Sequence, residues 1–399
     1  MPLTDLAIDH STWNVLPARQ QPDWSGHPSL PRVRAQLAES PPLTAVAEIR
    51  AVRRALARAA RGDALVLQLG DCAESFYECA PSRTRLKLEM IDRLAARLSE
   101  RTGTEVVRLG RLGGQFAKPR SKPTEPYGDR ELPVFRGHMV NSEIPSDAAR
   151  HPDPRRMLWA YQASAQVIEA VRTYRRRGGG AGHGPWTSHE ALVLDYESPL
   201  TRPGPGGAAY LTSTHLPWIG ERTRQTDHAH VRMLAGVHNP VACKIGPTAE
   251  PDEVARLCAL LDPGREPGRL TLIIRMGRDA IAGALPPVVR AVRAAGHPVT
   301  WLNDPMHGNT VTAGRGMKTR HLRHIAEEAE TFRTILRAHG EHPAGLHLEV
   351  ASTDVTECVG GPVAGEDELD AGYTTLCDPR LNPAQAAELV DAWPAAHAM

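Results

Sequence analysis

Eight short apolar runs recur along the sequence, and helical stretches separate most of them. The runs are mostly continuous rather than alternating, as strands of a parallel sheet covered on both faces should be. Eight strand-then-helix units of this kind predict a (β/α)8 barrel, in which a ring of helices surrounds a ring of parallel strands. We place the strands at 64–69, at a run that begins near 105, and at 191–196, 208–213, 240–245, 270–275, 298–302 and 345–350.

An open, doubly wound sheet is the alternative arrangement of such units. That fold would prefer a G-x-G-x-x-G turn after its first strand, and the sequence has none at that position. Polar residues cluster instead at the carboxyl ends of the predicted strands, where barrel enzymes carry their active sites. We therefore favour the barrel.

The segment before the first strand differs in composition from the rest. Residues 1–42 are rich in proline and tryptophan, which favours an extended arm over helices, and a helix with one apolar face is predicted from there to 60. We divide the chain, a single domain overall, into an N-terminal extension whose helix packs on the barrel, 1–60, and a catalytic barrel, 61–399. A long loop is predicted at 122–158, and further helices at 83–98, 158–175, 250–261, 279–295 and 319–338.

Charge and cysteine content exclude several classes of protein. The 47 Lys+Arg and 46 Asp+Glu give a formal net charge of +1, so no global basic field suggests nucleic acid or a membrane surface as a partner. No apolar run approaches the roughly 18 residues of a membrane span, and the N-terminus lacks the features of a signal peptide. The six cysteines form no C-x-x-C pair and are too few for a disulfide scaffold. We expect a reduced, cytoplasmic protein.

The stretch from Glu105 to Ser121 predicts an anion site. A short β-branched run is followed by three glycines, which let a backbone approach a ligand closely. Among and after the glycines lie four cations, and guanidinium and ammonium groups match phosphate or carboxylate. A solvated basic loop is the plainer interpretation, but the polar residues at the other strand ends favour a site. The four cations are Arg108, Arg111, Lys118 and Arg120.

Most polar residues at the predicted strand ends fall into two sets. Glu197 and His215 also lie at predicted strand ends but belong to neither set. The first set contains cations. Burying such a charge within an apolar strand is unfavourable unless an anion pairs with it. If these cations converge, they would hold a small substrate that carries a carboxylate and a phosphate. They are Arg111, Arg222, Lys244 and Arg275. The second set offers a thiolate, an imidazole and two carboxylates, a credible shell for Mn, Fe, Co or Zn. Its members are Cys72, His307, Glu349 and Asp378.

Each member of the second set also has an ordinary interpretation when taken singly. Cys72 could be an inert core thiol, His307 a turn cap, and Glu349 an interior carboxylate paired with an arginine. Their shared position, at a strand end or in the loop beyond it, favours the metal site over these separate roles.

Eight distinct motifs follow one another along the chain. They are G-D-C-A-E-S at 70–75, G-R-L-G-G-Q-F-A-K-P-R-S at 110–121, T-S-H-E-A-L-V-L-D-Y-E at 187–197, W-I-G-E-R-T-R-Q at 218–225, K-I-G-P at 244–247, R-M-G at 275–277, D-P-M-H-G-N-T at 304–310 and C-D-P-R-L-N at 377–382. From about Trp13 to Asn382 the chain resembles the type II 3-deoxy-D-arabino-heptulosonate 7-phosphate (DAHP) synthases.

The resemblance implies an enzyme that condenses phosphoenolpyruvate with erythrose 4-phosphate on a (β/α)8 barrel, as a homo-oligomer (dimer or tetramer). It implies one divalent ion, with Mn²⁺ as the first choice and Co²⁺, Fe²⁺ or Zn²⁺ as alternatives, held by Cys72, His307, Glu349 and Asp378. Phosphoenolpyruvate would be held by Arg111, Glu221, Arg222, Lys244 and Arg275. The aldose phosphate would be held by Lys118, Arg120 and Ser121. Catalytic roles would fall to Lys118, Glu221 and Arg222, with Glu221 as the candidate that activates water.

Two departures from the family pattern qualify these expectations. His138 follows F-R-G where the family usually carries an acidic residue, which puts one contact behind the site in doubt. The chain is also short and lacks some segments linked to feedback by aromatic amino acids, so we expect weak or absent feedback and a role in secondary metabolism. Two rival functions are the aminoshikimate variant of the reaction, which takes an amino analogue of the aldose, and a non-catalytic barrel that acts as a regulatory partner.

Overall fold

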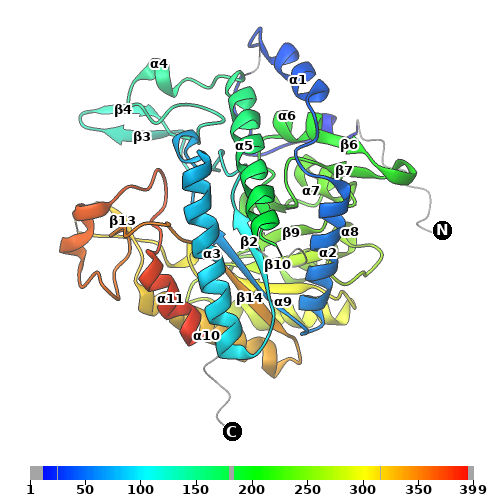
Figure 1. Cartoon of the computed structure of the whole chain (residues 1–399), viewed down its shortest axis with the longest axis vertical. Helices are drawn as coiled ribbons and strands as arrows, with labels where there is room; N and C mark the ends of the chain where they lie inside the picture. The colour runs from blue at the N-terminus through cyan, green and yellow to red at the C-terminus, as the bar shows by residue number, and fades with distance from the viewer. Residues whose placement is uncertain (1–11, 25, 179–183, 315, 394–399) are drawn as a thin grey trace.

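The protein, seen in a computed structural model that describes residues 12–24, 26–178, 184–314 and 316–393, is built on a closed barrel. Eight parallel strands follow one another around it in the order β1, β14, β11, β10, β9, β8, β5, β2, with helices outside them (Figure 1). This confirms the predicted (β/α)8 fold. The strands are β1 (Leu65–Gly70), β2 (Val106–Arg111), β5 (Trp186–Glu190), β8 (Leu216–Ile219), β9 (Val241–Ile245), β10 (Leu270–Ile274), β11 (Thr300–Asn303) and β14 (Pro343–Glu349).

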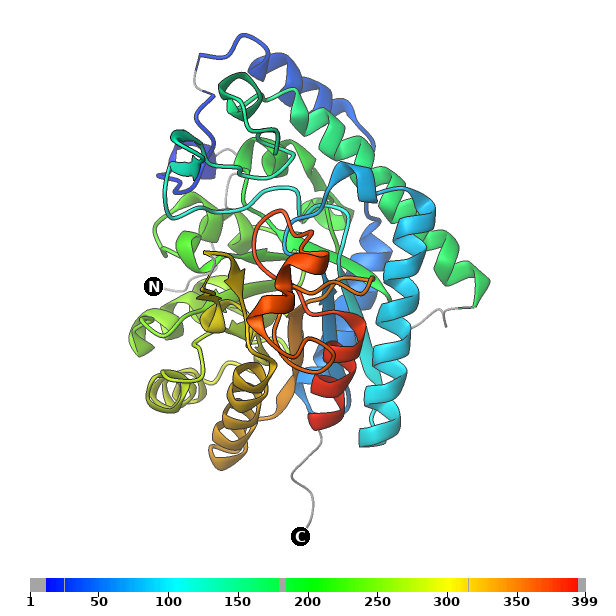
Figure 2. The same cartoon turned by 90° about the vertical axis from the view of Figure 1, so that its left-hand side faces the viewer.

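The outer helices close into a ring around the strands. Helix α3 (Pro81–Thr102) starts with a proline, which fits the first turn, and is followed by Gly103 at φ 67°. Helix α11 (Pro383–Ala392) lies beside α3 (Figures 1 and 2), where Arg97 donates to Asp391. No helix among the described residues is long and apolar enough to cross a membrane. The other outer helices are α5 (Arg156–Arg177), α7 (Ala229–Ala235), α8 (Pro251–Leu261), α9 (Ile281–Ala294) and α10 (Leu322–Ala338).

Helix α2 (Val46–Ala60) closes the amino-terminal end of the barrel. Its apolar face, which includes Val52 and Leu56, packs in one buried cluster with inward-facing strand residues such as Val66 and Leu302. The Thr300 hydroxyl, at the first residue of β11, donates to the carbonyl oxygen of Leu56. Because α2 fills this end, the carboxyl ends of the strands are left for ligands.

Shorter elements lie in the connections between strands and helices. They include helices α1 (Leu30–Glu39), α4 (Asp147–Arg150) and α6 (Leu194–Glu197), and the two-stranded sheets β3 (Thr124–Tyr127) with β4 (Arg130–Pro133), β6 (Thr201–Pro203) with β7 (Ala209–Leu211), and β12 (Val311–Thr312) with β13 (Lys318–Thr319). The 3-10 helices are η1 (Thr12–Val15), η2 (Phe76–Glu78), η3 (Ser198–Leu200), η4 (Pro205–Gly207), η5 (Glu221–Thr223), η6 (His307–Asn309) and η7 (Glu366–Gly372). The prediction of an extended arm over 1–42 is thus wrong for α1, and the predicted loop over 122–158 contains a hairpin and a short helix.

The strand predicted at 191–196 is wrong. The barrel strand is β5, W-T-S-H-E, five residues earlier; 191–193 is a connection without regular structure, and 194–196 belongs to α6. The polar side chains of β5 are buried because they find partners: His189 bonds Glu197 at 2.8 Å, and Ser188 donates to the carbonyl oxygen of Gly110 at 3.0 Å. A strand whose buried residues are polar does not show the apolar pattern used to find it.

The strand predicted at 208–213 is also misplaced. It contains β7, which pairs with β6 outside the barrel, and the barrel strand is β8. This moves two residues away from the strand ends where they were expected. Glu197 lies in α6, buried against His189 and Ser213, and His215 precedes β8, where its Nδ1 accepts from the backbone N–H of Thr187.

The contact between β14 and β1 generates a prediction about stability. Gly345 has φ 150°, and a Cβ there would lie 1.9 Å from the carbonyl oxygen of Val66. We expect Gly345→Ala to destabilise the barrel by about 3 kcal/mol and to lower the melting temperature by at least roughly 5 °C. The matched control is Gly283→Ala in α9, where a Cβ would meet nothing within 4 Å; it should stabilise by about 0.5 kcal/mol. Equal melting temperatures for the two variants would contradict this account of the strand pair.

Candidate active site and metal centre

A cavity of about 430 Å³ opens at the carboxyl ends of the barrel strands. It is lined by two of the predicted metal ligands, His307 and Asp378. A larger groove of about 870 Å³ lies outside the barrel, between α3 and α5, and contains none of the predicted site residues. All eight residues predicted to bind substrates line the smaller cavity: Arg111, Lys118, Arg120, Ser121, Glu221, Arg222, Lys244 and Arg275.

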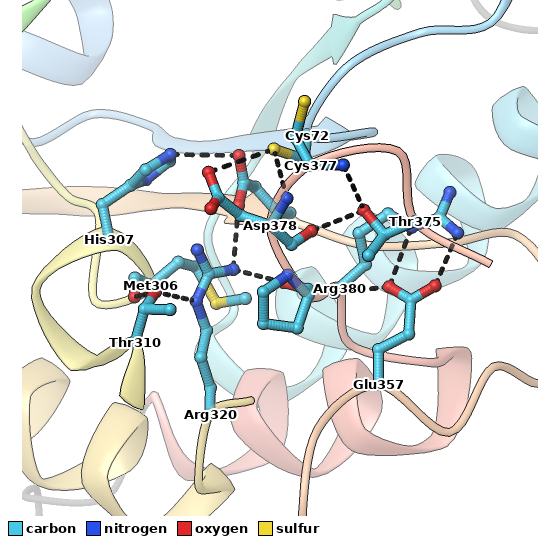
Figure 3. Close-up of polar contacts among 12 residues, drawn as sticks. Cys72, Met306, His307, Thr310, Arg320, Glu357, Thr375, Cys377, Asp378 and Arg380 are labelled. Atoms are coloured by element: carbon cyan, nitrogen blue, oxygen red, sulfur yellow. Dashed lines mark hydrogen bonds and ion pairs between the residues drawn. The ribbon is translucent and has the colours of Figure 1, made fainter. Parts of the chain in front are cut away.

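The four predicted metal ligands converge beside this cavity. Cys72 Sγ, one carboxylate oxygen of Glu349 and one of Asp378 all lie within 4.8 Å of one another. His307 Nε2 lies 3.1 Å from Glu349 Oε1, and the Cys72 thiol donates to Asp378 Oδ2 at 3.5 Å (Figure 3). Cys72, Glu349 and Asp378 therefore form one group of donors, and the imidazole of His307 contacts this group through Glu349. This donor set fits a divalent transition metal.

The register of three neighbouring strands brings distant residues together. Gly70, the last residue of β1, is paired with Glu349 on β14 and with Arg111 on β2. Gly70 has no side chain, and a Cβ there would lie 2.7 Å from the carbonyl oxygen of Arg111. Cys72 follows two residues later, so the thiol, the carboxylate and the guanidinium group meet at one corner of the barrel.

His307 and Glu349 are each oriented by charged partners. His307 Nδ1 lies 2.7 Å from Asp304 Oδ2, so its Nε2 is the nitrogen turned toward Glu349. Glu349 accepts from Arg111 at 3.0 Å and from Arg320 at 2.8 Å. A carboxylate behind a histidine fixes the tautomer and the direction of the ring in metal sites.

The loop that carries Asp378 is held by a second buried network. Arg380 donates to Glu357 at 2.8 Å, and Thr375 donates to the carbonyl oxygen of Asp378 at 2.7 Å (Figure 3). Arg380 also donates to Asp71 at 2.6 Å. Asp71 directly precedes Cys72 in the sequence. The network therefore ties this C-terminal loop to the end of β1.

Electrostatics keep the two carboxyl groups ionised. Burial alone would raise the pKa of Glu349, but His307, Arg320 and Lys118 hold it well below its usual value. Burial likewise opposes ionisation of Asp378, and Lys118 and Arg320 nevertheless lower its pKa. Two anionic ligands are thus ready for a cation.

The thiol behaves differently from the carboxyl groups. Burial raises the pKa of Cys72 well above its usual value, and the hydrogen bond with Cys377 and the charge of Glu349 add to this. A divalent cation reverses such an effect, because it deprotonates the thiol that coordinates it. The chemistry of this donor set is therefore complementary to a bound metal ion.

Cations also line the part of the cavity beside Trp218. The guanidinium group of Arg111 lies 5.2 Å and the ammonium group of Lys244 5.9 Å from the ring centroid of Trp218. Burial lowers the pKa of Lys244, although Asp304 stabilises the charge from 2.7 Å. Within the described ranges, Arg222 and Arg275 form no ion pair with an acid. Arg222 instead donates to the Ser121 hydroxyl at 2.7 Å, so both guanidinium groups can receive an anion.

Glu221, the predicted activator of water, is already engaged. Its carboxylate accepts from the backbone N–H of Gly246 at 2.6 Å and from Arg224 at 3.0 Å, and burial raises its pKa. Another acid in the same cavity was missed by the sequence prediction. Glu190 ends β5, and its carboxylate forms no hydrogen bond or ion pair with any described residue; its Oε1 is buried. Correct placement of β5 would have revealed it as a strand-end acid.

His138, the departure from the family pattern, lies beside the site rather than in it. Its Nδ1 accepts from the backbone N–H of Phe76 at 3.0 Å, and its Nε2 lies 2.6 Å from Glu143. The ring packs against the aromatic rings of Phe76 and Phe135. His138 therefore supports a loop, and it does not line the cavity.

The sequence and the fold of this chain are similar to those of known proteins. The sequence model of the class-II DAHP synthetase family matches residues 8–183 and 181–392. A probable phospho-2-dehydro-3-deoxyheptonate aldolase of Pseudomonas fluorescens is 47% identical over 380 residues, 95% of each chain. A phospho-2-dehydro-3-deoxyheptonate aldolase of Streptomyces coelicolor is 40% identical over 430 residues, again 95% of each chain. A solved phospho-2-dehydro-3-deoxyheptonate aldolase from Francisella tularensis SCHU S4 matches with TM-score 0.52 and 12% identity, over 90% of this chain and 96% of that one; this likeness supports the fold alone.

The metal centre can be tested by thermal stability in the absence of turnover. Mn²⁺ at about 100 times its dissociation constant should stabilise the folded protein by about 2.7 kcal/mol, because it binds only the folded state. His307→Ala should abolish this stabilisation, and Asp304→Asn should weaken Mn²⁺ binding by roughly 10- to 100-fold. His151→Ala, at an exposed histidine, is the control and should respond as the wild type does. An unchanged response in His307→Ala would refute the site.

Proposed function

This chain belongs to the class-II DAHP synthetase family, and we propose that it condenses phosphoenolpyruvate with erythrose 4-phosphate to give DAHP and inorganic phosphate. The observation that carries the proposal is the meeting of three metal-type donors, with His307 Nε2 3.1 Å from one of them, beside a cavity lined by cations. Family membership supports the reaction, and the convergence of the predicted residues supports their roles.

The cations would divide the two substrates between them. Arg111 and Lys244 are buried beside Trp218, and Arg275 directly follows β10. With Arg222 and Glu221 they would hold phosphoenolpyruvate. Guanidinium groups bind carboxylate and phosphate in bidentate fashion, which fixes the enol carbon for attack. Lys118, Arg120 and Ser121 would hold the phosphate of the aldose.

A divalent ion held by Cys72, His307, Glu349 and Asp378, which we propose to be Mn²⁺ with Co²⁺, Fe²⁺ or Zn²⁺ as alternatives, would supply Lewis-acid polarisation of the aldehyde. Lys118 Nζ lies 3.7 Å from Glu349 and 3.9 Å from Asp378. Burial opposes its charge, but Cys72, Glu349 and Asp378 raise its pKa. Lys118 therefore stays protonated, and its charge and N–H groups can stabilise the oxygen on which negative charge develops.

Water must then add to the cationic carbon before phosphate leaves. The carboxylate that accepts the proton of this water must be in the cavity and free. Glu221 is held by Arg224 and Gly246, whereas Glu190 has no hydrogen-bond or ion-pair partner within the described part of the chain. We therefore propose Glu190 for this step ahead of Glu221.

Pathway, assembly and location are further parts of the proposal. The alignment with the Streptomyces relative spans 430 residues although this chain has 399, so the relative contains inserted segments that this chain lacks. This supports an enzyme of secondary metabolism with weak or absent aromatic feedback. By family resemblance we propose a homo-oligomer, a dimer or tetramer. From the charge balance and cysteine usage we propose a cytoplasmic protein that binds neither nucleic acid nor membranes.

The reaction is tested by phosphate release. With Mn²⁺ and both substrates, the protein should release one phosphate for each phosphoenolpyruvate consumed, and a chelator should stop this until Mn²⁺ is restored. Lys118→Ala should lower kcat by about 100-fold or more, because it removes the cation that stabilises the oxygen on which charge develops. Arg290→Ala, at an exposed arginine of α9, is the matched control for charge removal.

Two outcomes of the same assay would change the conclusion. Release of phosphate with the amino analogue of the aldose but not with erythrose 4-phosphate would assign the aminoshikimate reaction. No release with either aldose from metal-loaded protein would leave a non-catalytic barrel.

The absence of feedback is tested in the same assay with added amino acids. Trp, Phe and Tyr, singly and together, should leave the rate within about two-fold of its value without them. Calorimetric titration of the three amino acids should likewise show no saturable heat. Strong inhibition by any of the three amino acids would contradict the expected absence of feedback and, with it, the argument for secondary metabolism.

A further inference from the structure

Helix α10 places a buried carboxylate beneath the active site. Glu328 has no exposed surface, and it does not line the cavity. In the described part of the chain no lysine or arginine forms an ion pair with it. Its hydrogen-bond partners are neutral: one backbone N–H and two asparagine side chains.

One of these partners, Asn303, ends strand β11, and the other two belong to two different loops of the site. Glu328 Oε1 accepts from the backbone N–H of Met276 at 3.2 Å and from Asn303 Nδ2 at 3.4 Å, and Oε2 accepts from Asn309 Nδ2 at 2.6 Å. Met276 directly follows Arg275, and Asn309 follows His307 by two residues. One carboxylate thus bonds the loop of a phosphate-binding arginine and the loop of a metal-ligand histidine.

The two loops also contact each other directly. A Cβ at Gly277 would lie 2.7 Å from the carbonyl oxygen of Gly308, and a Cβ at Gly308 would lie 2.2 Å from the backbone nitrogen of Gly277. Asn309 Oδ1 accepts from the backbone N–H of Arg278 at 3.1 Å. Because the backbones touch, a shift of one loop must be transmitted to the other.

A buried carboxylate without a cation is costly to retain. Burial and the nearby charge of Asp304 raise the pKa of Glu328 to about 7. An apolar side chain would fill the space at lower cost, but it could not accept from three N–H donors on two loops and the end of β11. The contact pattern therefore indicates a role in holding the loops rather than in packing.

We propose that Glu328 is a positioning residue that locks the Arg275 loop to the His307 loop, so that phosphoenolpyruvate and the divalent ion each strengthen the binding of the other. The proposal rests on the function proposed above for this site. Such coupling is reciprocal: the factor by which Mn²⁺ tightens phosphoenolpyruvate equals the factor by which phosphoenolpyruvate tightens Mn²⁺. In the wild type we expect this factor to be at least roughly five.

Glu328→Gln tests the proposal with little change of shape. The amide keeps one acceptor but turns an NH₂ group toward an N–H donor, so one loop loses its bond. Calorimetry should show dissociation constants for phosphoenolpyruvate and for Mn²⁺ that each rise about ten-fold, and a coupling factor near one. The KM for erythrose 4-phosphate should change less than about two-fold.

Two companion variants keep the test decisive. Glu330→Gln, at an exposed position of the same helix, should leave both constants and their coupling unchanged. Asn309→Ala removes the Oε2 bond together with the bonds of Asn309 to the Arg278 N–H and the Pro305 carbonyl oxygen. It should also reduce the coupling, which provides the test if Glu328→Gln does not fold. If Glu328→Gln lowers the melting temperature but leaves both dissociation constants and the coupling unchanged, the inference is wrong. Because binding is measured without turnover, failure of the condensation assay would refute the proposed reaction separately.

Discussion

The site depends on one buried carboxylate and the cations around it. Glu349 has no exposed surface, and it lies 3.0 Å from Arg111, 2.8 Å from Arg320, 3.1 Å from His307 and 3.7 Å from Lys118. A charge in such a place is unfavourable unless several partners stabilise it. Glu349 meets that condition only because β14 lies beside β1 in a register that sets it next to Gly70 and the strand carrying Arg111. The barrel thereby joins the wall of cations to the cluster of metal-type donors.

The rest of the site follows from loops that charged groups hold in place. Asp304 fixes the imidazole of His307, and Arg380 ties the loop of Asp378 to the end of β1. A flexible loop would place its ligand too loosely for a metal ion or for a reacting carbonyl group. These networks are buried, so each lost partner would leave an uncompensated charge, and the loops have little freedom to rearrange.

Much of this arrangement could be predicted from the sequence, and the failures have physical causes. The apolar run predicted at 240–245 and the helical stretch predicted at 250–261 match β9 and α8 closely. Helix α1 was missed because Pro31 was interpreted as a breaker, although proline is tolerated in a first turn. Strand β5 was missed because its buried side chains are polar and are paired by residues distant in sequence, and Glu190 was missed with it. The eight substrate residues could be named from motifs, but the engagement of Glu221 by Arg224 required coordinates.

The central claim is that four side chains from both ends of the chain hold one ion beside the cations. Anomalous diffraction from crystals grown with Mn²⁺ tests it most directly, because the signal locates the metal itself. The account predicts a single anomalous peak bounded by Cys72 Sγ, His307 Nε2 and the carboxylates of Glu349 and Asp378. An anomalous peak elsewhere would contradict it. So would crystals at saturating Mn²⁺ in which the four side chains still bond one another and hold no metal.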